Sequence, residues 1–284
     1  MSQKVIVTGA NGQLGSEIRQ IADNYNFQFI FTDIDALDLL DNNAADTFFK
    51  EHNPAFIINC AAYTNVDKAE EDADAARMVN AVLPARLAEY AANAGGTLIH
   101  VSTDYVFAGT HHRPLKEDDP TAPQSSYGKT KLEGENAIKN MDNVLIVRTS
   151  WLYSSFGNNF VKSMLRLTKE RDELRIVFDQ VGSPTYAGDL AKAILQMITA
   201  PTEKIVPGIY HYSNEGVCSW YDLTFEIRAL TGADCKILPI ETKDYPLPAP
   251  RPHYSIMNKE KIKTQFGLEI PHWRSSLQKC IKKL

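Results

Sequence analysis

Short apolar runs alternate with longer amphipathic segments through the first half of the chain. The runs have the length of buried strands and lie at residues 4–8, 27–32, 56–60, 97–102 and 144–149. Helical patterns separate them, at residues 16–25, 43–52, 72–94 and 125–140. A regular alternation of strand and helix predicts a parallel sheet covered by helices on both faces. We therefore expect an α/β fold built on a doubly wound parallel sheet.

The pattern changes after about residue 150, where proline and glycine become frequent and the strand-like runs become shorter. We expect helices at residues 160–169 and 188–197 and strands at 174–178 and 209–212. The segment 245–252 is too rich in proline for a helix or a central strand, so we expect an extended segment that lies over a pocket. This organisation predicts a first domain at residues 1–150 and a smaller, interleaved lobe at residues 151–284, with approximate borders.

Composition narrows the function classes. The chain has 284 residues, 44% of them apolar and 23% charged, which is typical of a globular protein. A formal charge of −5 gives no basic surface for nucleic acid. No apolar run approaches the roughly 20 residues of a membrane span, and no signal-peptide pattern precedes the first strand. The four cysteines have neither metal-site spacing nor the density of a disulfide scaffold, so we expect a cytoplasmic protein.

A glycine-rich turn follows the first predicted strand and leads into the first predicted helix. Gly9 permits a tight turn, Gly12 lets the backbone approach a pyrophosphate, and Gly15 lets the helix pack closely on the sheet. The helix N-terminus favours anions through its free N–H groups. An ordinary strand–helix turn is the alternative reading. The context favours a Rossmann-type site for NAD(P), with the following residues near the cofactor: Gly9, Asn11, Gly12, Gln13, Leu14 and Gly15.

Further cofactor contacts are expected where the next strands end. Asp33 follows the second strand, where a carboxylate accepts hydrogen bonds from the adenosine ribose and repels a 2′-phosphate, unless it is only a solvated turn residue. This position favours NADH over NADPH. Asp38 and Leu39 are weaker candidates for contacts with the adenine. Ala61 and Ala62 follow the third strand, and their small side chains let a dinucleotide come close.

Tyr127 and Lys131 stand four residues apart in a predicted helix and therefore share one face. An adjacent ammonium lowers the pKa of a phenol, which suits Tyr127 to protonate an alkoxide formed by hydride transfer. Lys131 is also placed to bind the nicotinamide ribose. Ser102 and Thr103 end the fourth strand, and one of these hydroxyls is expected to polarise a substrate carbonyl. A surface tyrosine beside a surface lysine is the alternative reading of the helical pair.

The chain resembles the extended short-chain dehydrogenases/reductases and, among them, the dTDP-4-dehydrorhamnose reductases. The resemblance runs through nearly the whole chain and is carried by Gly9–Gly15, residues 59–70 (NCAAYTNVDKAE), 102–107 (STDYVF), 127–135 (YGKTKLEGE), 148–153 (RTSWLY) and 179–185 (DQVGSPT), with Arg251, Pro252 and Ser255. It implies a catalytic triad of Thr103, Tyr127 and Lys131. It also implies cofactor contacts from Tyr63 and Asn80 and substrate contacts from Thr103, Tyr105, Trp151 and Arg251. A core aromatic is the alternative for Trp151, and a solvated cation is the alternative for Arg251.

The same resemblance implies an activity, which is the reduction by NADH or NADPH of the C4 ketone of dTDP-4-dehydro-β-L-rhamnose. The product, dTDP-β-L-rhamnose, serves cell-surface polysaccharide synthesis. We expect a monomer or homodimer without a metal site: Glu17 matches a metal-linked glutamate of some relatives, but the C-terminus offers it no acidic partner. The alternatives are another nucleotide-sugar reductase or epimerase with the same triad, and a non-catalytic regulatory subunit like that of S-adenosylmethionine synthetase.

Overall fold

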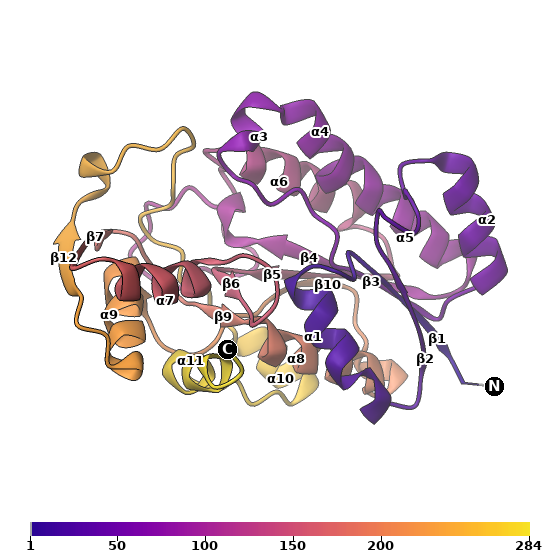
Figure 1. Ribbon diagram of the computed structural model, residues 1–284. Helices are drawn as coiled ribbons and strands as arrows, with labels where there is room; N and C mark the ends of the chain where they lie inside the picture. The colour runs from indigo at the N-terminus through magenta and orange to yellow at the C-terminus, as the bar shows by residue number, and fades with distance from the viewer. Residues whose placement is uncertain (1) are drawn as a thin grey trace.

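A computed structural model describes residues 2–284 of the protein. Its centre is a six-stranded, all-parallel sheet with the order β10-β5-β4-β3-β1-β2 (Figure 1). The strands are β1 (Lys4–Thr8), β2 (Gln28–Thr32), β3 (Phe56–Asn59), β4 (Thr97–Thr103), β5 (Val144–Thr149) and β10 (Gly208–His211). This architecture confirms the predicted α/β class. The chain passes from β1 to β2 on one side and returns to β3 on the other, so the switch point that binds ligands in such sheets lies at β1.

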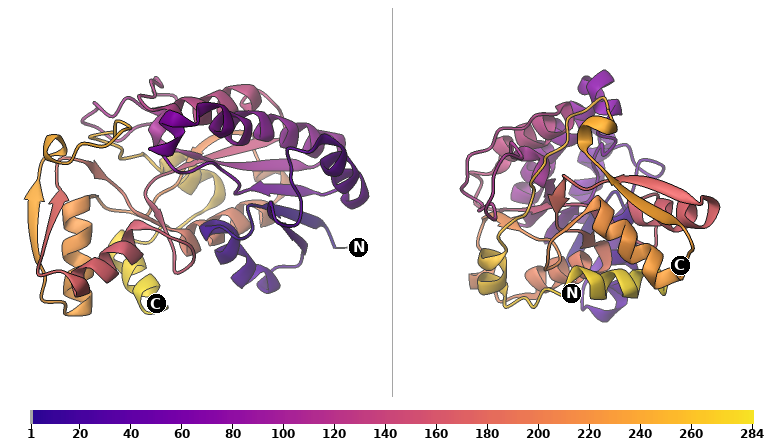
Figure 2. Two further views of the ribbon diagram at one scale, coloured as in Figure 1. Left: turned by 45° about the horizontal axis from the view of Figure 1, so that its top comes forward. Right: turned by 90° about the vertical axis from the view of Figure 1, so that its left-hand side faces the viewer.

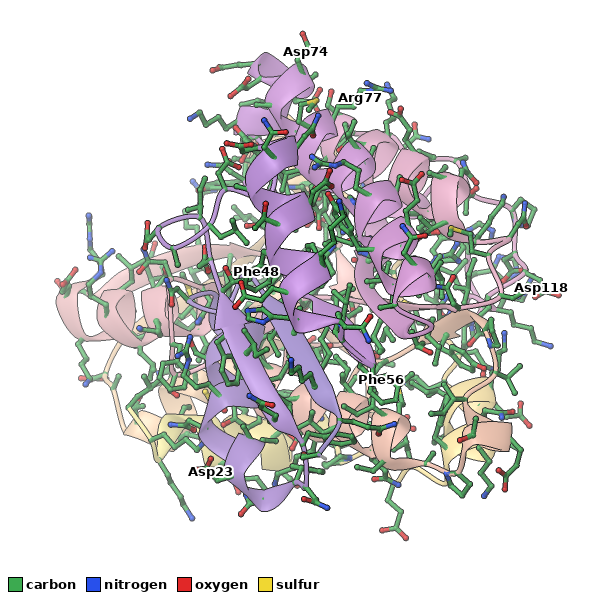
Figure 3. All side chains as sticks on the ribbon, turned by 90° about the vertical axis from the view of Figure 1, so that its right-hand side faces the viewer. Asp23, Phe48, Phe56, Asp74, Arg77 and Asp118 are labelled. Atoms are coloured by element: carbon green, nitrogen blue, oxygen red, sulfur yellow. The ribbon has the colours of Figure 1, made fainter. Side chains whose placement is uncertain are left out.

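Helices cover both faces of the sheet (Figure 3). One face packs against α1 (Gln13–Ile21), α8 (Ala187–Thr199) and α10 (Glu260–Phe266), and the other against α2 (Asn42–His52), α5 (Leu83–Asn93) and α6 (Ser126–Ile138). Alternate residues of β1 enter the two cores, with Val5 and Val7 on the α1 side and Ile6 on the α5 side. The central strands are therefore apolar on both faces, as a sheet buried between two helical layers requires.

The later part of the chain builds a second, smaller lobe beside the sheet (Figure 2). Its helices α7 (Phe160–Glu170), α9 (Trp220–Thr231) and α11 (Trp273–Ile281) share a core around the buried Trp273. A parallel pair of strands, β7 (Glu173–Val177) and β12 (Lys236–Ile240), lies at the outer side. Two short strand pairings complete the lobe: β6 (Leu152–Tyr153) pairs with β9 (Thr185–Tyr186), and β8 (Val181–Gly182) pairs with β11 (Cys218–Ser219). The division of the chain at residue 150 stays a prediction.

The helix predicted at residues 72–94 is interrupted. The structure has α3 (Lys68–Glu71), α4 (Ala73–Arg77), a π-helical turn at Met78–Val82 and then α5. Pro84 has no N–H to donate to the carbonyl of Asn80, which favours a break in the helical bonding at this point. A Cβ on Gly134 would lie 2.1 Å from that carbonyl oxygen, so α6 packs against the irregular turn.

Two further segments differ little from expectation. The first helix begins at Gln13 rather than residue 16, because the glycine turn leads directly into it. Residues 245–252 form an extended, irregular segment, here called the proline-rich strap, which runs over a cavity as expected.

Within residues 2–284, no helix has both the length and the apolar character needed to cross a membrane.

Candidate active site

An open cavity of about 760 Å³ lies at the carboxyl ends of the central strands. It brings together the glycine turn from β1–α1, the loop after β3, the end of β4 and the start of α6. The predicted site residues that line it are Gly9, Asn11, Gly12, Gln13, Leu14, Asp33, Ala61, Ala62, Thr103, Tyr105, Tyr127, Lys131 and Trp151. Candidates for cofactor binding and for catalysis therefore share one cleft.

The glycine turn has the geometry that a dinucleotide pyrophosphate requires. Gly9 has a φ of +61°, and a Cβ there would lie 2.6 Å from the backbone nitrogen of Ala61. Gly12 caps α1 without a side-chain hydrogen bond, which leaves N–H groups of the first turn free to meet an anion. A Cβ on Gly15 would lie 2.5 Å from the carbonyl oxygen of Gly9, so this glycine serves the close packing of the turn.

Asp33 is fixed at the edge of the cleft by two backbone groups. Its Oδ2 accepts a hydrogen bond from the backbone nitrogen of Asn11 at 2.8 Å, and its Oδ1 accepts one from Ile34 at 2.8 Å. The carboxylate thereby joins the end of β2 to the glycine turn. It lines the cleft on the side where an adenosine ribose is expected.

Besides Gly15, four candidates for cofactor binding do not line the cleft: Asp38, Leu39, Tyr63 and Asn80. Leu39 is buried in the core under α2 and α5, and Asp38 accepts a hydrogen bond from the backbone of Leu40 within a turn. Asn80 is fully buried, and its amide bonds both the backbone N–H and the carbonyl of Tyr63. Asn80 therefore holds the loop after β3 in place, because the π-helical turn directs its side chain toward that loop.

Thr103, Tyr127 and Lys131 lie together where α6 meets the end of β4. The Ser125 hydroxyl caps α6 by accepting a hydrogen bond from Gly128 at 3.1 Å, which places Tyr127 in the first turn. Lys131 Nζ donates to the carbonyl oxygen of Val101 at 2.7 Å. Burial lowers the pKa of Lys131 to about 8, against the opposing effect of Glu135. A pKa in this range lets Lys131 exchange protons near neutral pH.

The pKa of Tyr127 differs from expectation in the protein alone. Burial raises it to about 12, and the hydroxyl of Thr103 acts in the opposite direction. Desolvation disfavours the phenolate more strongly than the neighbouring groups favour it. Tyr127 is therefore a protonated phenol in this state, which is the form that a proton donor requires.

Asp104 is a cleft residue that the sequence reasoning missed. Burial raises its pKa to about 6, and Thr103 Oγ1 donates a hydrogen bond to its Oδ1 at 3.1 Å. Its Oδ2 is buried without a hydrogen-bond partner among residues 2–284. Asp104 follows Thr103 directly at the end of β4. Its position next to a proposed catalytic hydroxyl was the feature of the sequence that could have identified it as a site residue.

A buried ion pair anchors α6 behind the cleft. Arg148 Nη2 lies 2.7 Å from Glu135 Oε2, and both side chains are almost fully buried. Ser102 Oγ donates to Glu135 Oε1 at 2.5 Å. Because Ser102 belongs to β4 and Arg148 to β5, these contacts fix the helix that carries Tyr127 and Lys131 onto two strands of the sheet.

Two stacked tryptophans form another wall of the cleft. Trp151 has a φ of +48°, which is uncommon for a residue other than glycine and often marks a functional site. Its ring stacks on that of Trp220, with the ring centroids 3.5 Å apart. The sequence reasoning missed Trp220, although the capping pattern Ser219-x-x-Asp222 before an apolar run signals the start of α9.

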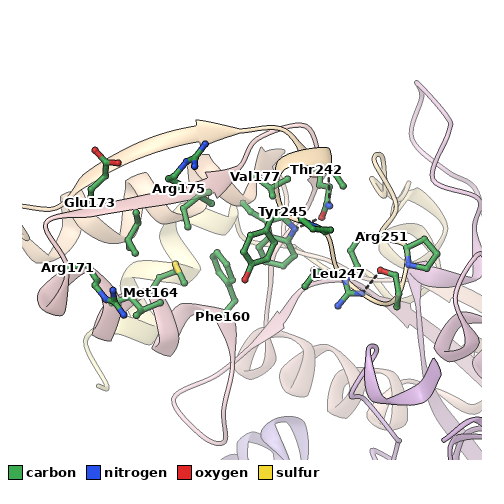
Figure 4. Close-up of a pocket in the computed structure, with 18 of the residues that line it drawn as sticks. Phe160, Met164, Arg171, Glu173, Arg175, Val177, Thr242, Tyr245, Leu247 and Arg251 are labelled. Carbon is green, nitrogen blue, oxygen red and sulfur yellow. Dashed lines mark hydrogen bonds between the residues drawn. The ribbon is translucent and has the colours of Figure 1, made fainter. Parts of the chain in front are cut away.

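A second cavity, of about 690 Å³, lies under the proline-rich strap (Figure 4). Phe160, Trp220 and Tyr105 line both cavities, so the two adjoin. Arg171, Arg175 and Arg251 give the second cavity a cationic character beside its aromatic rings. This is the composition expected where a ring system and phosphate groups bind together.

Arg251 does not point freely into this cavity. Its guanidinium lies 2.7 Å from Asp67 Oδ2 and also donates to Asp67 Oδ1 at 2.8 Å. A further hydrogen bond from Nη1 reaches the carbonyl oxygen of Ala249 at 2.7 Å. The strap is thereby tied to the loop before α3, on the other side of the cleft.

Glu17 is buried on α1 with partners that are not acidic. Ser154 Oγ donates to its Oε1 at 2.7 Å, and Lys283 Nζ lies 3.5 Å from its Oε2. Within the described part of the chain, no group of three histidine, cysteine, aspartate or glutamate side chains has the arrangement of a metal site. The absence of a metal remains a prediction, and the ammonium of Lys283 supports it because a cation already faces this carboxylate.

The fold and the cleft define a Rossmann-type oxidoreductase that acts with a nicotinamide dinucleotide. The sequence matches the family described as RmlD substrate binding domain over residues 3–284. It is 38% identical over 280 residues to the spore coat polysaccharide biosynthesis protein SpsK of Bacillus subtilis, covering 98% of this chain and 97% of that protein. The chain belongs to the RmlD family.

Solved structures agree with this assignment. The dTDP-4-dehydrorhamnose reductase of Clostridium acetobutylicum superposes with a TM-score of 0.94 at 46% identity, covering 99% of each chain. The dTDP-4-dehydrorhamnose reductase of Bacillus anthracis, solved in complex with NADP, has a TM-score of 0.95 at 37% identity, and all of both chains is covered. Family membership therefore rests on both sequence and structure along the whole chain.

Proposed function

We propose that the protein reduces the C4 ketone of dTDP-4-dehydro-β-L-rhamnose to dTDP-β-L-rhamnose, with NADH or NADPH as the reductant. The observation that carries this proposal is one cleft in which Tyr127, Thr103 and Lys131 stand beside a dinucleotide turn and open toward a second, cationic and aromatic cavity. The similarity to two dTDP-4-dehydrorhamnose reductases of known structure supports the choice of sugar.

The chain's own residues supply the proton and hold the ketone. The bound nicotinamide supplies the hydride. Tyr127, protonated because burial raises the pKa of its phenol, donates its proton to the oxygen at C4. Thr103 donates a hydrogen bond to the same oxygen, for which its hydroxyl must leave Asp104. Lys131 holds the cofactor ribose and stabilises the phenolate that remains after proton transfer.

The cofactor occupies the glycine-turn side of the cleft in this proposal. Its pyrophosphate lies at the N-terminus of α1, and Asp33 accepts hydrogen bonds from the adenosine ribose. The Bacillus anthracis relative was solved with NADP, so a 2′-phosphate is compatible with the family fold. We propose that this chain accepts both cofactors and that Asp33 favours NADH.

The nucleotide of the substrate occupies the second cavity. The thymine ring packs against aromatic side chains such as Tyr245, and the diphosphate pairs with guanidinium groups, whose fork matches phosphate oxygens. Tyr105, which lines both cavities, and Trp151, whose ring stacks on Trp220 between them, then contact the sugar. Arg251 reaches the diphosphate only if it gives up part of its ion pair with Asp67.

The test is an assay of NADH and NADPH oxidation with enzymatically prepared dTDP-4-dehydro-L-rhamnose. We expect both cofactors to be oxidised, with dTDP-L-rhamnose identified by mass and by NMR of the sugar. Protein that binds the cofactors but oxidises neither with this substrate contradicts the proposed reaction.

A second candidate is the reduction of a different nucleotide-linked keto sugar, which the similarity to a spore coat polysaccharide biosynthesis protein favours. The same cleft and the same residues serve this reaction. A panel of 4-keto sugar nucleotides in the same assay separates the two candidates by their relative kcat/KM. The expected cytoplasmic location and the monomeric or homodimeric state stay predictions.

A further inference from the structure

A row of polar side chains crosses three neighbouring strands beneath the proposed catalytic lysine. Thr8 ends β1, Asn59 ends β3 and His100 lies in β4, and the register pairs Thr8 with Asn59 and Asn59 with His100. Side chains at paired positions of a parallel sheet point to the same face. All three side chains are fully buried, and the row meets Lys131 of α6 at its last member.

The orientation of the Asn59 amide is fixed by a group whose role cannot change. The backbone N–H of Ala61 donates to Asn59 Oδ1 at 3.2 Å, and a backbone nitrogen is always a donor. Thr8 Oγ1 donates to the same oxygen at 2.7 Å. If the amide were turned over, its NH₂ group would face the N–H of Ala61, and two donors would oppose each other.

This orientation determines where His100 carries its hydrogen. Asn59 Nδ2 lies 3.0 Å from His100 Nδ1, and because the amide nitrogen donates, Nδ1 must accept. A neutral imidazole with an accepting Nδ1 carries its hydrogen on Nε2. Burial holds the pKa of His100 well below its ordinary value, with Lys131 acting in the same direction, so the ring is neutral.

His100 Nε2 faces Lys131 Nζ at 3.4 Å. An ammonium has only hydrogens to offer to this N–H group, whereas a neutral amine offers a lone pair that accepts from it. We propose that His100 is a positioning residue that acts through Lys131, and that Asn59 sets its tautomer so that the row favours the amine form of the lysine. Nothing else in the proposed reaction uses Thr8, Asn59 or His100.

The other groups around Lys131 act on its charge in different directions. Val101 accepts a hydrogen bond from Nζ in either form. Glu135, one turn further along α6, favours the ammonium, but its carboxylate is engaged by Arg148 of β5. Tyr127 is protonated and carries no charge in this state. Burial and the His100 N–H group therefore oppose the ammonium, whereas Glu135 favours it.

The consequence is a lysine that gives up its proton readily. A lysine whose pKa lies near neutrality can return a proton to the Tyr127 phenolate after each turnover, and the amine that remains then takes a proton from water in the open cleft. Such transfers are efficient between groups whose pKa values lie near the working pH. This kinetic consequence rests on the proposed function. The tautomer of His100 and the titration of Lys131 do not, because both exist in the protein without substrate.

The first test is NMR of the whole protein. Long-range proton–nitrogen correlation, with His100 assigned through the backbone, reports which ring nitrogen carries the hydrogen. Lysine labelled at the ε carbon reports the titration of Lys131. We expect a neutral His100 with its hydrogen on Nε2 and one lysine that titrates well below the others. A hydrogen on Nδ1 in the unaltered protein overturns the proposal without any variant.

The second test reverses the tautomer by Asn59→Asp. The carboxylate still accepts from Thr8 and Ala61, and it also accepts from Nδ1, so the His100 hydrogen moves and Nε2 becomes an acceptor for the ammonium. We expect the midpoint of the Lys131 titration, here called the Lys131 midpoint, to rise by about one pH unit, which is a tenfold change in the ratio of ammonium to amine. In NADH oxidation, the limb of the pH profile that reports Lys131 should move by the same amount.

Thr8→Val is the matched control. It removes one donor to Asn59 and keeps the shape of the side chain, but the N–H of Ala61 still fixes the amide. We expect the His100 tautomer and the Lys131 midpoint to stay as they were. In Asn59→Asp, a changed tautomer with an unchanged Lys131 midpoint contradicts the proposal. A raised midpoint with the original tautomer also contradicts it, since the new charge would then act directly. Loss of turnover with the proposed sugar leaves both NMR readings intact and counts only against the proposed reaction.

Discussion

At the scale of single residues, the chemistry depends on Tyr127, which is a poor acid before the substrate reacts. Burial raises the pKa of its phenol, so the residue holds its proton until charge develops on the substrate oxygen. A bound, oxidised nicotinamide and the ammonium form of Lys131 both favour the phenolate once the proton has left. The group is therefore protonated when it must donate and is stabilised after it has done so.

Replacing this phenol should abolish most of the turnover. For Tyr127→Phe we expect kcat to fall roughly 10²- to 10⁴-fold, the range for loss of a general acid, with cofactor affinity almost unchanged. Stopped-flow turnover and cofactor fluorescence titration measure the two quantities. Tyr90→Phe is the control, because its phenol bonds Asp46 far from the cleft. Near-normal turnover in Tyr127→Phe would remove the tyrosine from the mechanism.

Asp33 should govern the choice between the two cofactors. In Asp33→Asn the side-chain oxygen still accepts from the backbone of Asn11, so the turn is kept while the negative charge is lost. A charge interaction of about 1 kcal/mol with a 2′-phosphate in water corresponds to roughly a fivefold change. We expect the ratio of kcat/KM for NADPH to that for NADH to rise by this factor.

Asp23→Asn provides a comparison for Asp33→Asn, because Asp23 lies in the turn after α1 and does not line the cleft. It removes one negative charge from the same part of the chain. A cofactor ratio that rises equally in both variants would show that net charge, rather than the position of Asp33, controls the preference.

At the scale of elements, α6 is the part of the fold on which the site depends most. The helix carries Tyr127 and Lys131, and its third turn carries Glu135, whose carboxylate is bound by Arg148 and Ser102. A buried ion pair adds little stability relative to a well-packed apolar pair, but it defines one position for the helix. The spacing of the three residues along α6 therefore couples the site to the sheet.

Breaking this pair on one side should destabilise the whole protein. Arg148→Met leaves the Glu135 carboxylate buried without its partner, which is expected to lower the free energy of unfolding by about 3–5 kcal/mol. Urea unfolding followed by circular dichroism measures the change. Arg77→Met is the control, since it breaks an exposed pair with Glu133 and should leave stability nearly unchanged. Equal effects of the two substitutions would contradict the anchoring role of Arg148.

The sequence predicted the central elements well because their signals are local. The strand at residues 144–149 has the bounds of β5, and the glycine turn, Tyr127 and Lys131 all line one cleft. Other features depend on partners distant in the chain. The stacking of Trp220 on Trp151 and the contact of His100 with Lys131 join separate elements, so no local pattern reveals them.

Leu39 shows the reverse case. Its place in a connection after β2 suggested a contact with adenine, yet apolar residues of α2 and α5 bury it. Burial decided this position, and burial follows from packing between elements rather than from the residue itself. The helix predicted at residues 72–94 failed for two reasons. Pro84 is a local signal for a break in the helical bonding, whereas the close approach of Gly134 to the carbonyl of Asn80 is a tertiary contact that the sequence does not reveal.

At the scale of the molecule, the ion pair of Arg251 and Asp67 joins the strap to the other side of the cleft. For Asp67→Asn we expect amide hydrogen exchange in the strap to become roughly fivefold faster, as a partly exposed pair worth about 1 kcal/mol implies. Glu241→Gln, which breaks an exposed pair with Lys243, is the control. Mass spectrometry of peptides from residues 245–252 measures the difference.

Low pH should also make amide hydrogen exchange in the strap faster. The hydrogen bond from Arg251 holds the pKa of Asp67 below its ordinary value. A carboxylate whose pKa is lowered in the folded protein stabilises the contact fully at pH values above its unfolded pKa of about 4. This stabilisation is lost as the pH falls through the lowered pKa. Strap protection that declines already between pH 8 and pH 6 would contradict this assignment.

During synthesis on the ribosome, β10 and α8 are completed long after the strands and helices on which they pack. About 60 residues separate the end of β5 at Thr149 from the end of β10 at His211. At 5–20 residues per second, a ribosome needs roughly 3–12 s to cover that distance. During this interval the outer edge of β5 has no neighbour, and until α8 is complete at Thr199 the apolar side of α1 lacks the helix that will cover it. The nascent chain thus holds a complete nucleotide-binding sequence that cannot yet be stable, and we expect chaperones to meet it at that open edge.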